Sequence, residues 1–209
     1  MTRRLPNPPL LVITDQAMTA DLIATVAGAL QGGARWIMLR EKNLAPAVRL
    51  ALARQVKFHT ANYHASLSIN TDLDTALAIG AEGLHLPSDL LCQDSASARR
   101  YSHLLRGASV HDDTEVARAV AMGVDYLVVA PVFITDSKPR GRAPLGLAGL
   151  KAMVAKSPIP VIALGGITPQ LAPACLAAGA NGIATMGAVM RAADPGGVVR
   201  DFLKEMSWQ

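Results

Sequence analysis

The sequence predicts one α/β domain, a (β/α)8 TIM barrel that occupies residues 1–209. The first observation is that eight short apolar runs alternate along the chain with segments of helical spacing. The second is that these runs are apolar at consecutive positions, as expected for parallel strands with both faces covered. The third is that no linker divides the chain, of which 51% is hydrophobic. An open doubly wound sheet is the alternative, but eight strand–helix units in 209 residues favour a closed barrel.

The first four units each begin with a short apolar run. Their strands are expected at Leu10–Ile13, Trp36–Leu39, Ser66–Ile69 and Gly83–Leu86. Helical spacing predicts helices over Thr19–Gln31 and Ala45–Tyr63, a short helix that ends at Gly80, and another that begins near Ser95. The pair Gly32-Gly33 follows the first of these helices, and glycine commonly ends a helix.

The last four units follow the same pattern. Their strands are expected at Ala108–Val110, Tyr126–Ala130, Val161–Leu164 and in a run that begins at Gly182. The helices are expected over Thr114–Met122, Leu147–Ala155, Thr168–Ala178 and Pro195–Glu205. Thr168 is a good N-cap residue and Pro169 suits the first helical turn. A longer loop rich in polar, proline and glycine residues covers Pro131–Gly146.

Composition limits the class of protein. Charged residues make up 17% and aromatic residues 4% of the chain, whereas a nucleic-acid-binding protein usually interleaves more Lys and Arg with aromatic side chains. The net charge of +4 suits an anionic small molecule. Cys92 and Cys175 lie far apart without metal-ligand spacing, which favours a reducing cytoplasm. We expect no signal peptide and no membrane span, because prolines interrupt the N-terminal segment and no apolar run is long enough.

Two glycine turns predict a phosphate site. Gly165-Gly166 ends the expected strand over Val161–Leu164, and Gly187-Ala188 follows the last expected strand. Glycine lets backbone N–H groups approach an anion closely, and the turns after strands seven and eight of a TIM barrel commonly bind phosphate.

Polar side chains follow the other expected strands, and in a barrel they share one face. They are Arg40, Lys42, Asn70, His85, Ser109, His111, Thr135, Ser137 and Lys138. Arginine, lysine and hydroxyl side chains at such positions can bind phosphate groups. No pair of carboxylates, serine nucleophile elbow or zinc-ligand spacing stands out, which argues against a glycosidase, a serine hydrolase or a zinc enzyme.

Several of these motifs resemble one family when they are taken together and in order. They are Met38-Leu39-Arg40-Glu41-Lys42, Ile69-Asn70, Gly83-Leu84-His85, Ser109-Val110-His111, Pro131 to Lys138 and Ala163-Leu164-Gly165-Gly166-Ile167. Together they are similar to the thiamine phosphate synthase/TenI superfamily from about Leu10 to Ala193.

The resemblance implies a barrel that binds a thiazole phosphate. In the synthase, an aminopyrimidine methyl diphosphate loses magnesium-bound pyrophosphate, and the thiazole nitrogen attacks the resulting cation. The resemblance places Arg40, Lys42 and Asn70 on the pyrophosphate side, and the glycine turns of Gly165, Gly166 and Gly187 on the thiazole phosphate. Between the two substrates it places Ser109, Thr135, Ser137 and Lys138.

The sequence departs from the synthase pattern at the magnesium ligands. Thr71 and Leu90 stand where the synthase has its two magnesium-binding aspartates, and Asp72 and Asp89 are each one residue away. Met38 replaces a glutamine of that pattern. Magnesium is therefore expected only if the chain is a synthase.

The stretches around His85-Leu86-Pro87-Ser88 and Val132-Phe133 look more like the TenI branch, which includes thiazole tautomerases. Pro131 occupies the place of the acid/base histidine of a TenI type. Proton transfer would then fall to His111, His85 or Lys42.

Three hypotheses follow from the sequence. The first is a TenI-like protein of thiamine biosynthesis that binds thiazole phosphate, either as a tautomerase or as an accessory. The alternatives are a thiamine phosphate synthase that uses both substrates, and a non-catalytic barrel that binds a phosphate ligand. The expected partners are small molecules and not nucleic acid or membrane, and a homo-oligomer is left open.

Overall fold

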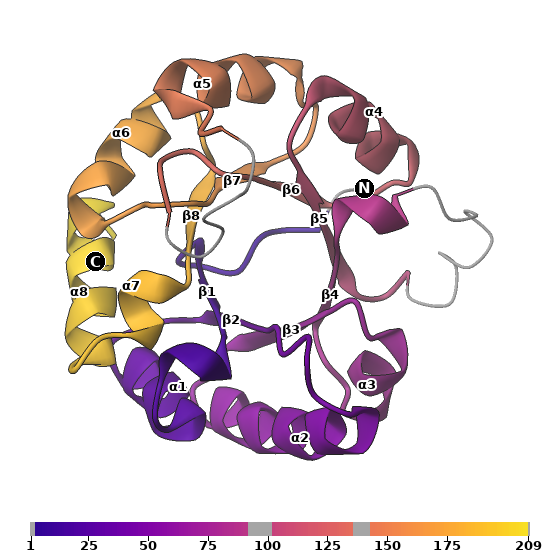
Figure 1. The fold of residues 1–209 in the computed structure, drawn as a ribbon, viewed down its shortest axis with the longest axis vertical. Coiled ribbons are helices and arrows are strands. Elements are labelled where there is room, and N and C mark those ends of the chain that lie inside the picture. Colours follow the sequence, from indigo (N-terminus) through magenta and orange to yellow (C-terminus); the bar gives the residue numbers. More distant parts are fainter. Residues whose placement is uncertain (1–2, 92–101, 136–142, 209) are drawn as a thin grey trace.

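The computed structural model describes residues 3–91, 102–135 and 143–208. Eight parallel strands form a closed barrel in chain order, with β1 paired to both β2 and β8 (Figure 1). The strands are β1 (Leu10–Ile13), β2 (Trp36–Leu39), β3 (Ser66–Asn70), β4 (Gly83–Leu86), β5 (Leu105–Val110), β6 (Tyr126–Val129), β7 (Val161–Ala163) and β8 (Gly182–Thr185). The predicted (β/α)8 barrel is therefore confirmed.

Helices surround the barrel as an outer ring (Figure 1). They are α1 (Leu22–Gln31), α2 (Pro46–Asn62), α3 (Leu73–Ala78), α4 (Asp113–Ala121), α5 (Gly146–Lys156), α6 (Ala172–Ala177), α7 (Gly187–Met190) and α8 (Pro195–Glu205). Short 3-10 helices are η1 (Gln16–Met18), η2 (Ser88–Leu90) and η4 (Pro169–Leu171). None of the helices within the described ranges is long and apolar enough to cross a membrane.

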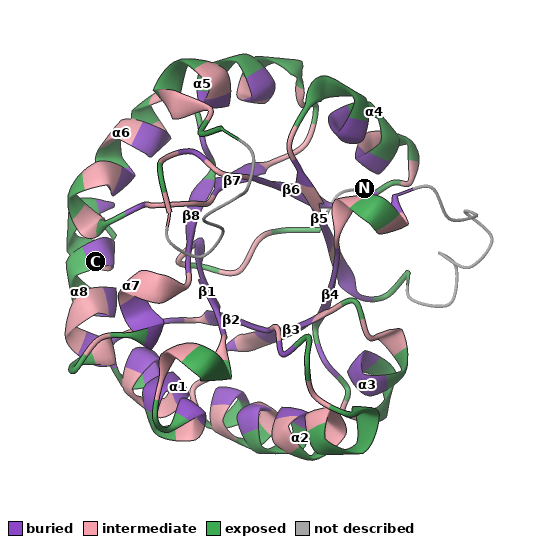
Figure 2. Ribbon diagram, in the orientation of Figure 1, coloured by how far each residue is buried: buried purple, intermediate pink, exposed green. Residues whose placement is uncertain are grey.

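The strands bury both of their faces, as their continuous apolar sequences require (Figure 2). The outward residues pack with the inner faces of the helices in one large apolar cluster. The inward residues form a second cluster inside the barrel, in which the rings of Trp36 and Tyr126 meet edge to face at 4.9 Å. Gly107 on β5 leaves the room for this arrangement, because a Cβ atom there would overlap the Tyr126 ring.

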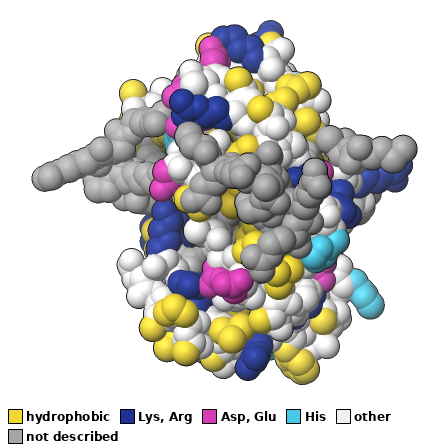
Figure 3. All heavy atoms as spheres, turned by 90° about the vertical axis from the view of Figure 1, so that its right-hand side faces the viewer, with side chains coloured by type: hydrophobic (Ala, Val, Ile, Leu, Met, Phe, Trp, Pro, Cys, Tyr) yellow, Lys and Arg dark blue, Asp and Glu magenta, His cyan; other side chains and the backbone are white. Residues whose placement is uncertain are grey.

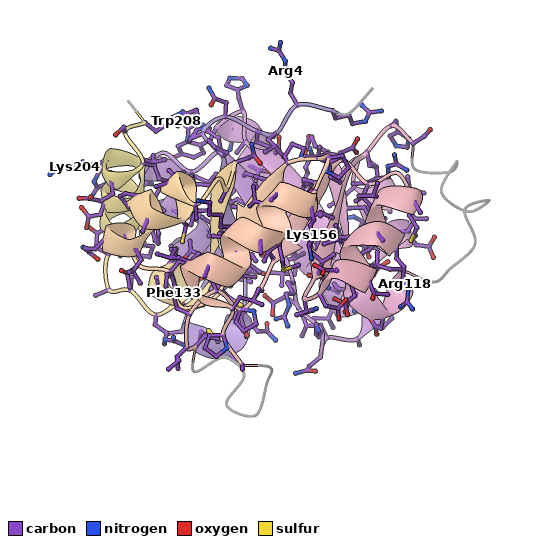
Figure 4. The ribbon with its side chains drawn as sticks, turned by 90° about the horizontal axis from the view of Figure 1, so that it is seen from above. Arg4, Arg118, Phe133, Lys156, Lys204 and Trp208 are labelled. Carbon is purple, nitrogen blue, oxygen red and sulfur yellow. The ribbon has the colours of Figure 1, made fainter. Side chains whose placement is uncertain are left out.

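The two ends of the barrel differ in what covers them. Leu5, from the N-terminal segment, packs against the inner cluster. In the side view, Arg4 and Trp208 lie toward one end of the molecule, and Phe133 lies toward the other (Figure 4). Phe133 belongs to the segment that follows β6, so its end carries the loops that follow the strands. Functional side chains are expected at this end of a TIM barrel.

The structure differs from the sequence prediction in several element bounds. The first helix begins at Leu22, because Asp21 caps it, and Thr19 instead ends η1. Strand β5 begins three residues before the predicted Ala108. The helix predicted over Thr168–Ala178 is divided into η4 and α6, and α7 was not predicted. The helix predicted from Ser95 lies mostly outside the described residues.

Candidate functional site

A cavity of about 630 Å³ opens at the end of the barrel where the strands terminate. It is lined by residues that follow strands from every part of the barrel. Among the residues predicted from sequence, it brings together Arg40, Lys42, Asn70, His85, Asp89, Ser109, His111, Thr135, Gly165, Gly166, Gly187 and Ala188. Ser137 and Lys138 lie outside the described residues. The cavity also contains Ile134, Thr185 and Arg191, which the sequence analysis did not select.

Glu41 anchors the segment that carries Arg40 and Lys42. Its carboxylate is buried, accepts a hydrogen bond from Thr14 Oγ1 at 2.7 Å, and accepts a second from the Gln16 N–H at 3.1 Å. Thr14 Oγ1 in turn accepts from the Arg40 N–H at 3.0 Å. Burial raises the pKa of Glu41 against the effect of these hydrogen bonds. The carboxylate therefore belongs to the support of the site, and Arg40 and Lys42 on either side of it line the cavity.

His85 lies beneath the floor of the cavity and is almost wholly buried. Its Nε2 lies 2.8 Å from Ser109 Oγ, and its Nδ1 lies 3.3 Å from the Tyr126 hydroxyl. Burial, with a smaller contribution from the charge of Arg40, lowers the pKa of His85 to about 3. A ring that stays neutral is suited to orienting Ser109. It is poorly suited to accepting a proton near neutral pH, the role that the sequence analysis listed for it.

His111 forms a close pair with Glu115, four residues further along the chain. Glu115 Oε2 lies 2.8 Å from His111 Nδ1 and also accepts the His111 backbone N–H at 2.7 Å. Asp112 caps α4 by accepting the Glu115 N–H, which fixes the start of the helix that carries the carboxylate. A carboxylate beside Nδ1 favours the proton on that nitrogen and leaves Nε2 as the basic atom. His111 lines the cavity and has the geometry of an acid/base group.

Asp72 has a structural environment. Its carboxylate caps α3 by accepting the Thr75 N–H at 2.9 Å and accepts the Thr75 hydroxyl at 2.7 Å. Arg49 binds the same carboxylate through Nε at 2.8 Å and Nη2 at 2.7 Å. Burial acts to raise the pKa of Asp72, but the hydrogen bonds from Thr75 and the Arg49 charge together lower it. These contacts occupy the oxygen atoms that a metal ion would need.

The residues present do not fit a magnesium site held by two carboxylates. Asp89 is exposed and lines the cavity from η2, but Asp72 does not line it. Across residues 3–91, 102–135 and 143–208, no group of three or more His, Cys, Asp and Glu side chains is placed to hold a metal ion. Magnesium takes few protein ligands, yet it usually takes at least one carboxylate together with phosphate oxygens.

The glycine pair after β7 has a packing role in addition to the predicted one. Gly165 and Gly166 have φ values of +106° and +65°, which side chains rarely adopt. A Cβ atom on Gly166 would overlap the Ile134 carbonyl oxygen, and one on Gly165 would lie 2.8 Å from Pro131 Cα. The N–H groups of Val132 and Phe133 donate to the Leu164 and Gly165 carbonyls at 2.9 Å. The turn is therefore fixed against the segment that follows β6.

Three comparisons with known proteins agree on one family. The family model described as thiamine monophosphate synthase matches residues 10–189. A putative thiamine-phosphate synthase of Geobacter sulfurreducens is 42% identical over 188 residues, covering 89% of this chain and 88% of that protein. A thiamine-phosphate synthase of Moorella thermoacetica is 38% identical over 175 residues, covering 84% of this chain and 83% of that protein.

A solved structure gives the same result. The thiamine phosphate pyrophosphorylase of Pyrococcus furiosus superimposes with a TM-score of 0.83 at 32% identity and covers 95% of each chain. The names of these relatives favour the synthase, which the sequence analysis gave as an alternative, over the TenI-like branch that it placed first. The chain belongs to the thiamine monophosphate synthase family.

Proposed function

We propose that this chain is a thiamine-phosphate synthase, which joins an aminopyrimidine methyl diphosphate to a thiazole phosphate and releases pyrophosphate. The observation that carries the proposal is one cavity with anion-binding groups of two kinds. Arg40, Lys42 and Asn70 follow β2 and β3, and the glycine turns follow β7 and β8. The names of the relatives support the same activity.

The reaction asks the protein to stabilise a leaving group. The bond between the pyrimidine methylene carbon and the diphosphate oxygen breaks, and the diphosphate keeps the electron pair. The thiazole nitrogen then gives its lone pair to the methylene carbon and forms the new C–N bond. The guanidinium of Arg40 and the ammonium of Lys42 lie where they can stabilise the negative charge that develops on the diphosphate.

Two further groups would position the thiazole. The turns at Gly165-Gly166 and Gly187 would hold its phosphate through backbone N–H groups. Ser109, oriented by the neutral His85, would offer a hydroxyl between the two substrates. Because the described carboxylates do not fit a magnesium site, no step of this mechanism passes through a metal ion.

The pair of His111 and Glu115 favours a second candidate, the thiazole tautomerase activity of the TenI branch. In this reaction a base takes a proton from one atom of a thiazole carboxylate phosphate, and a proton is returned at another atom of the ring system. His111 Nε2 would carry the proton, and Glu115 would stabilise the imidazolium that forms. This reaction needs no diphosphate and no metal ion.

One experiment separates these candidates. The protein is incubated with aminopyrimidine methyl diphosphate and thiazole phosphate, with magnesium or with a chelator, and thiamine phosphate is measured by chromatography. Formation of thiamine phosphate, lost in Arg40→Met and kept in Arg118→Met, would support the synthase. Arg118 is an exposed residue of the outer helix α4 (Figure 4).

The same samples test the other readings. If no thiamine phosphate forms, NMR in deuterium oxide would follow proton exchange on the thiazole carboxylate phosphate. Exchange that depends on His111 would support the tautomerase. Binding of the thiazole phosphate without either reaction would leave the non-catalytic barrel.

A further inference from the structure

Arg191 lies over Gly187 at the rim of the cavity. Both residues line the cavity, and they are four positions apart across the short helix α7. A Cβ atom built on Gly187 would overlap Arg191 Nη2 and lie 2.8 Å from Arg191 Cζ. Long side chains on a helix lean toward its N-terminus, so residue 191 is placed to cover residue 187. The missing side chain at position 187 therefore makes room for the guanidinium group.

The guanidinium group of Arg191 has a weak protein partner. Its printed hydrogen bond runs from Nη1 to the thioether sulfur of Met18 at 3.4 Å, and a thioether is a poor acceptor. Arg49 and Arg200, in contrast, each bind a carboxylate. Among the described residues, no carboxylate oxygen lies within ion-pair distance of Arg191. The positive charge is thus available to an anion in the cavity.

The neighbourhood of Arg191 identifies the kind of anion. Strand β8 pairs with β7 and with β1, so the segment after β8 lies between the turn of Gly165-Gly166 and the η1 segment that contains Met18. Arg40 and Lys42 follow β2, on the far side of β1. Elsewhere on the molecule, basic side chains are not gathered in this way. On the face drawn in Figure 3 they are interspersed with acidic and uncharged side chains.

We propose that Arg191 is a phosphate-binding residue, which holds a phosphate monoester against the glycine turns after β7 and β8. Its planar fork of N–H donors matches two phosphate oxygens, which Met18 cannot replace. Gly187 serves this function by leaving space for the guanidinium. The identity of the ester as thiazole phosphate rests on the proposed function, whereas the contact between Arg191 and phosphate does not.

Calorimetry of four proteins tests the contact. Wild type, Arg191→Met, Arg191→Lys and the control Arg118→Met are titrated with thiazole phosphate and with the corresponding thiazole alcohol. Loss of a charge-assisted contact should weaken thiazole phosphate binding by about 10- to 100-fold in Arg191→Met, with a smaller loss in Arg191→Lys. The alcohol should bind all four proteins equally. Equal phosphate affinity in wild type and Arg191→Met would overturn the proposal.

Gly187→Ala tests the role assigned to the glycine. The position does not have a positive φ, and the atoms that a Cβ atom would meet belong to a flexible side chain, so the fold should tolerate alanine. Gly187→Ala should displace Arg191 and weaken thiazole phosphate binding to a similar extent. The double variant with Arg191→Met should then bind no more weakly than either single variant. Losses that add in the double variant would show that Gly187 acts without Arg191.

Inorganic phosphate separates this inference from the proposed function. If wild type binds inorganic phosphate through Arg191 but does not bind thiazole phosphate, the proposed substrate is wrong and the phosphate contact stands. If Arg191→Met binds inorganic phosphate as well as wild type does, or if neither binds it, the contact is refuted whatever the substrate.

Discussion

Glu115 binds His111 twice with one oxygen atom. Oε2 accepts the backbone N–H of His111 at 2.7 Å and lies 2.8 Å from its Nδ1. The first contact fixes the backbone at the end of β5, and the second fixes the imidazole ring on that backbone. A single carboxylate therefore determines both where the ring lies and which of its nitrogens faces away from the protein partner. The catalytic use of His111 would depend on this arrangement.

The first prediction concerns the tautomer of His111. Nitrogen NMR at about pH 8.5, where an ordinary imidazole is neutral, should show the proton on Nδ1 in wild type. Glu115→Ala should shift the neutral ring toward the Nε2-protonated form, because the acceptor for the Nδ1 proton is lost. Exposed Glu205→Ala is the control. The same tautomer in wild type and Glu115→Ala would refute the role of the carboxylate.

A second prediction concerns the effect of pH on stability through His85. Its pKa is about 3 in the folded protein and about 6.5 in an unfolded chain, so the unfolded state binds more protons between these values. The free energy of unfolding should therefore fall as pH decreases through this range, by an amount on the order of 4 kcal/mol from this residue. Above about pH 6.5 its contribution should be constant.

His85→Gln isolates this contribution, because glutamine does not titrate. Denaturant unfolding of both proteins should show wild type more stable at about pH 7, since the variant disturbs the contacts to Ser109 and Tyr126. The difference should shrink or reverse at about pH 4. Two stability curves that stay parallel between these pH values would contradict a depressed pKa for His85.

The third prediction treats Asp72 as a structural residue. Asp72→Ala removes the cap of α3 and the carboxylate partner of Arg49, so it should lower the free energy of unfolding by about 2 kcal/mol. The affinity for thiazole phosphate in magnesium should change less than about two-fold. Asp74→Ala, in the first turn of the same helix, is the matched control for stability. A large loss of affinity that requires magnesium would instead make Asp72 a metal ligand.

The sequence predicts the barrel well because its strands are covered on both faces. The bounds of β1, β2 and β4 match the prediction, since each is an uninterrupted apolar run. The start of β5 was missed because Arg106-Gly107 interrupts such a run. Gly107 belongs to the strand because its neighbour on β6, Tyr126, fills the space of a side chain. This exchange of volume between two strands is a tertiary relationship that the local pattern does not contain.

The candidate site was predictable where residues follow strands directly. Arg40, Asn70 and His111 share a cavity because the ends of parallel strands meet at one face of a barrel. Glu115 and Arg191 were missed because each acts across one turn of a helix. The pair His111 and Glu115 has a readable spacing of four residues, and the pair Gly187 and Arg191 has the same spacing. The second pair was hidden because α7, with four residues, is too short to leave a periodic pattern.

The last prediction concerns why position 166 requires glycine. Gly166 and Gly80 have almost equal φ values of +65° and +61°, so alanine at either position suffers similar backbone strain, about 1 kcal/mol. A Cβ atom on Gly80 would meet nothing within 4 Å, whereas one on Gly166 would overlap the Ile134 carbonyl oxygen. Gly166→Ala should therefore lower the free energy of unfolding by at least about 2 kcal/mol more than Gly80→Ala does.

Denaturant unfolding of both variants measures this difference, and titration with inorganic phosphate shows what it does to the site. Because the overlap involves the segment after β6, Gly166→Ala should also displace Ile134 and weaken phosphate binding, while Gly80→Ala should leave binding unchanged. Equal destabilisation by the two substitutions would mean that the segment after β6 can move away at little cost. In that case a loss of phosphate binding in Gly166→Ala would come from the anion meeting the new methyl group, as the sequence alone predicted.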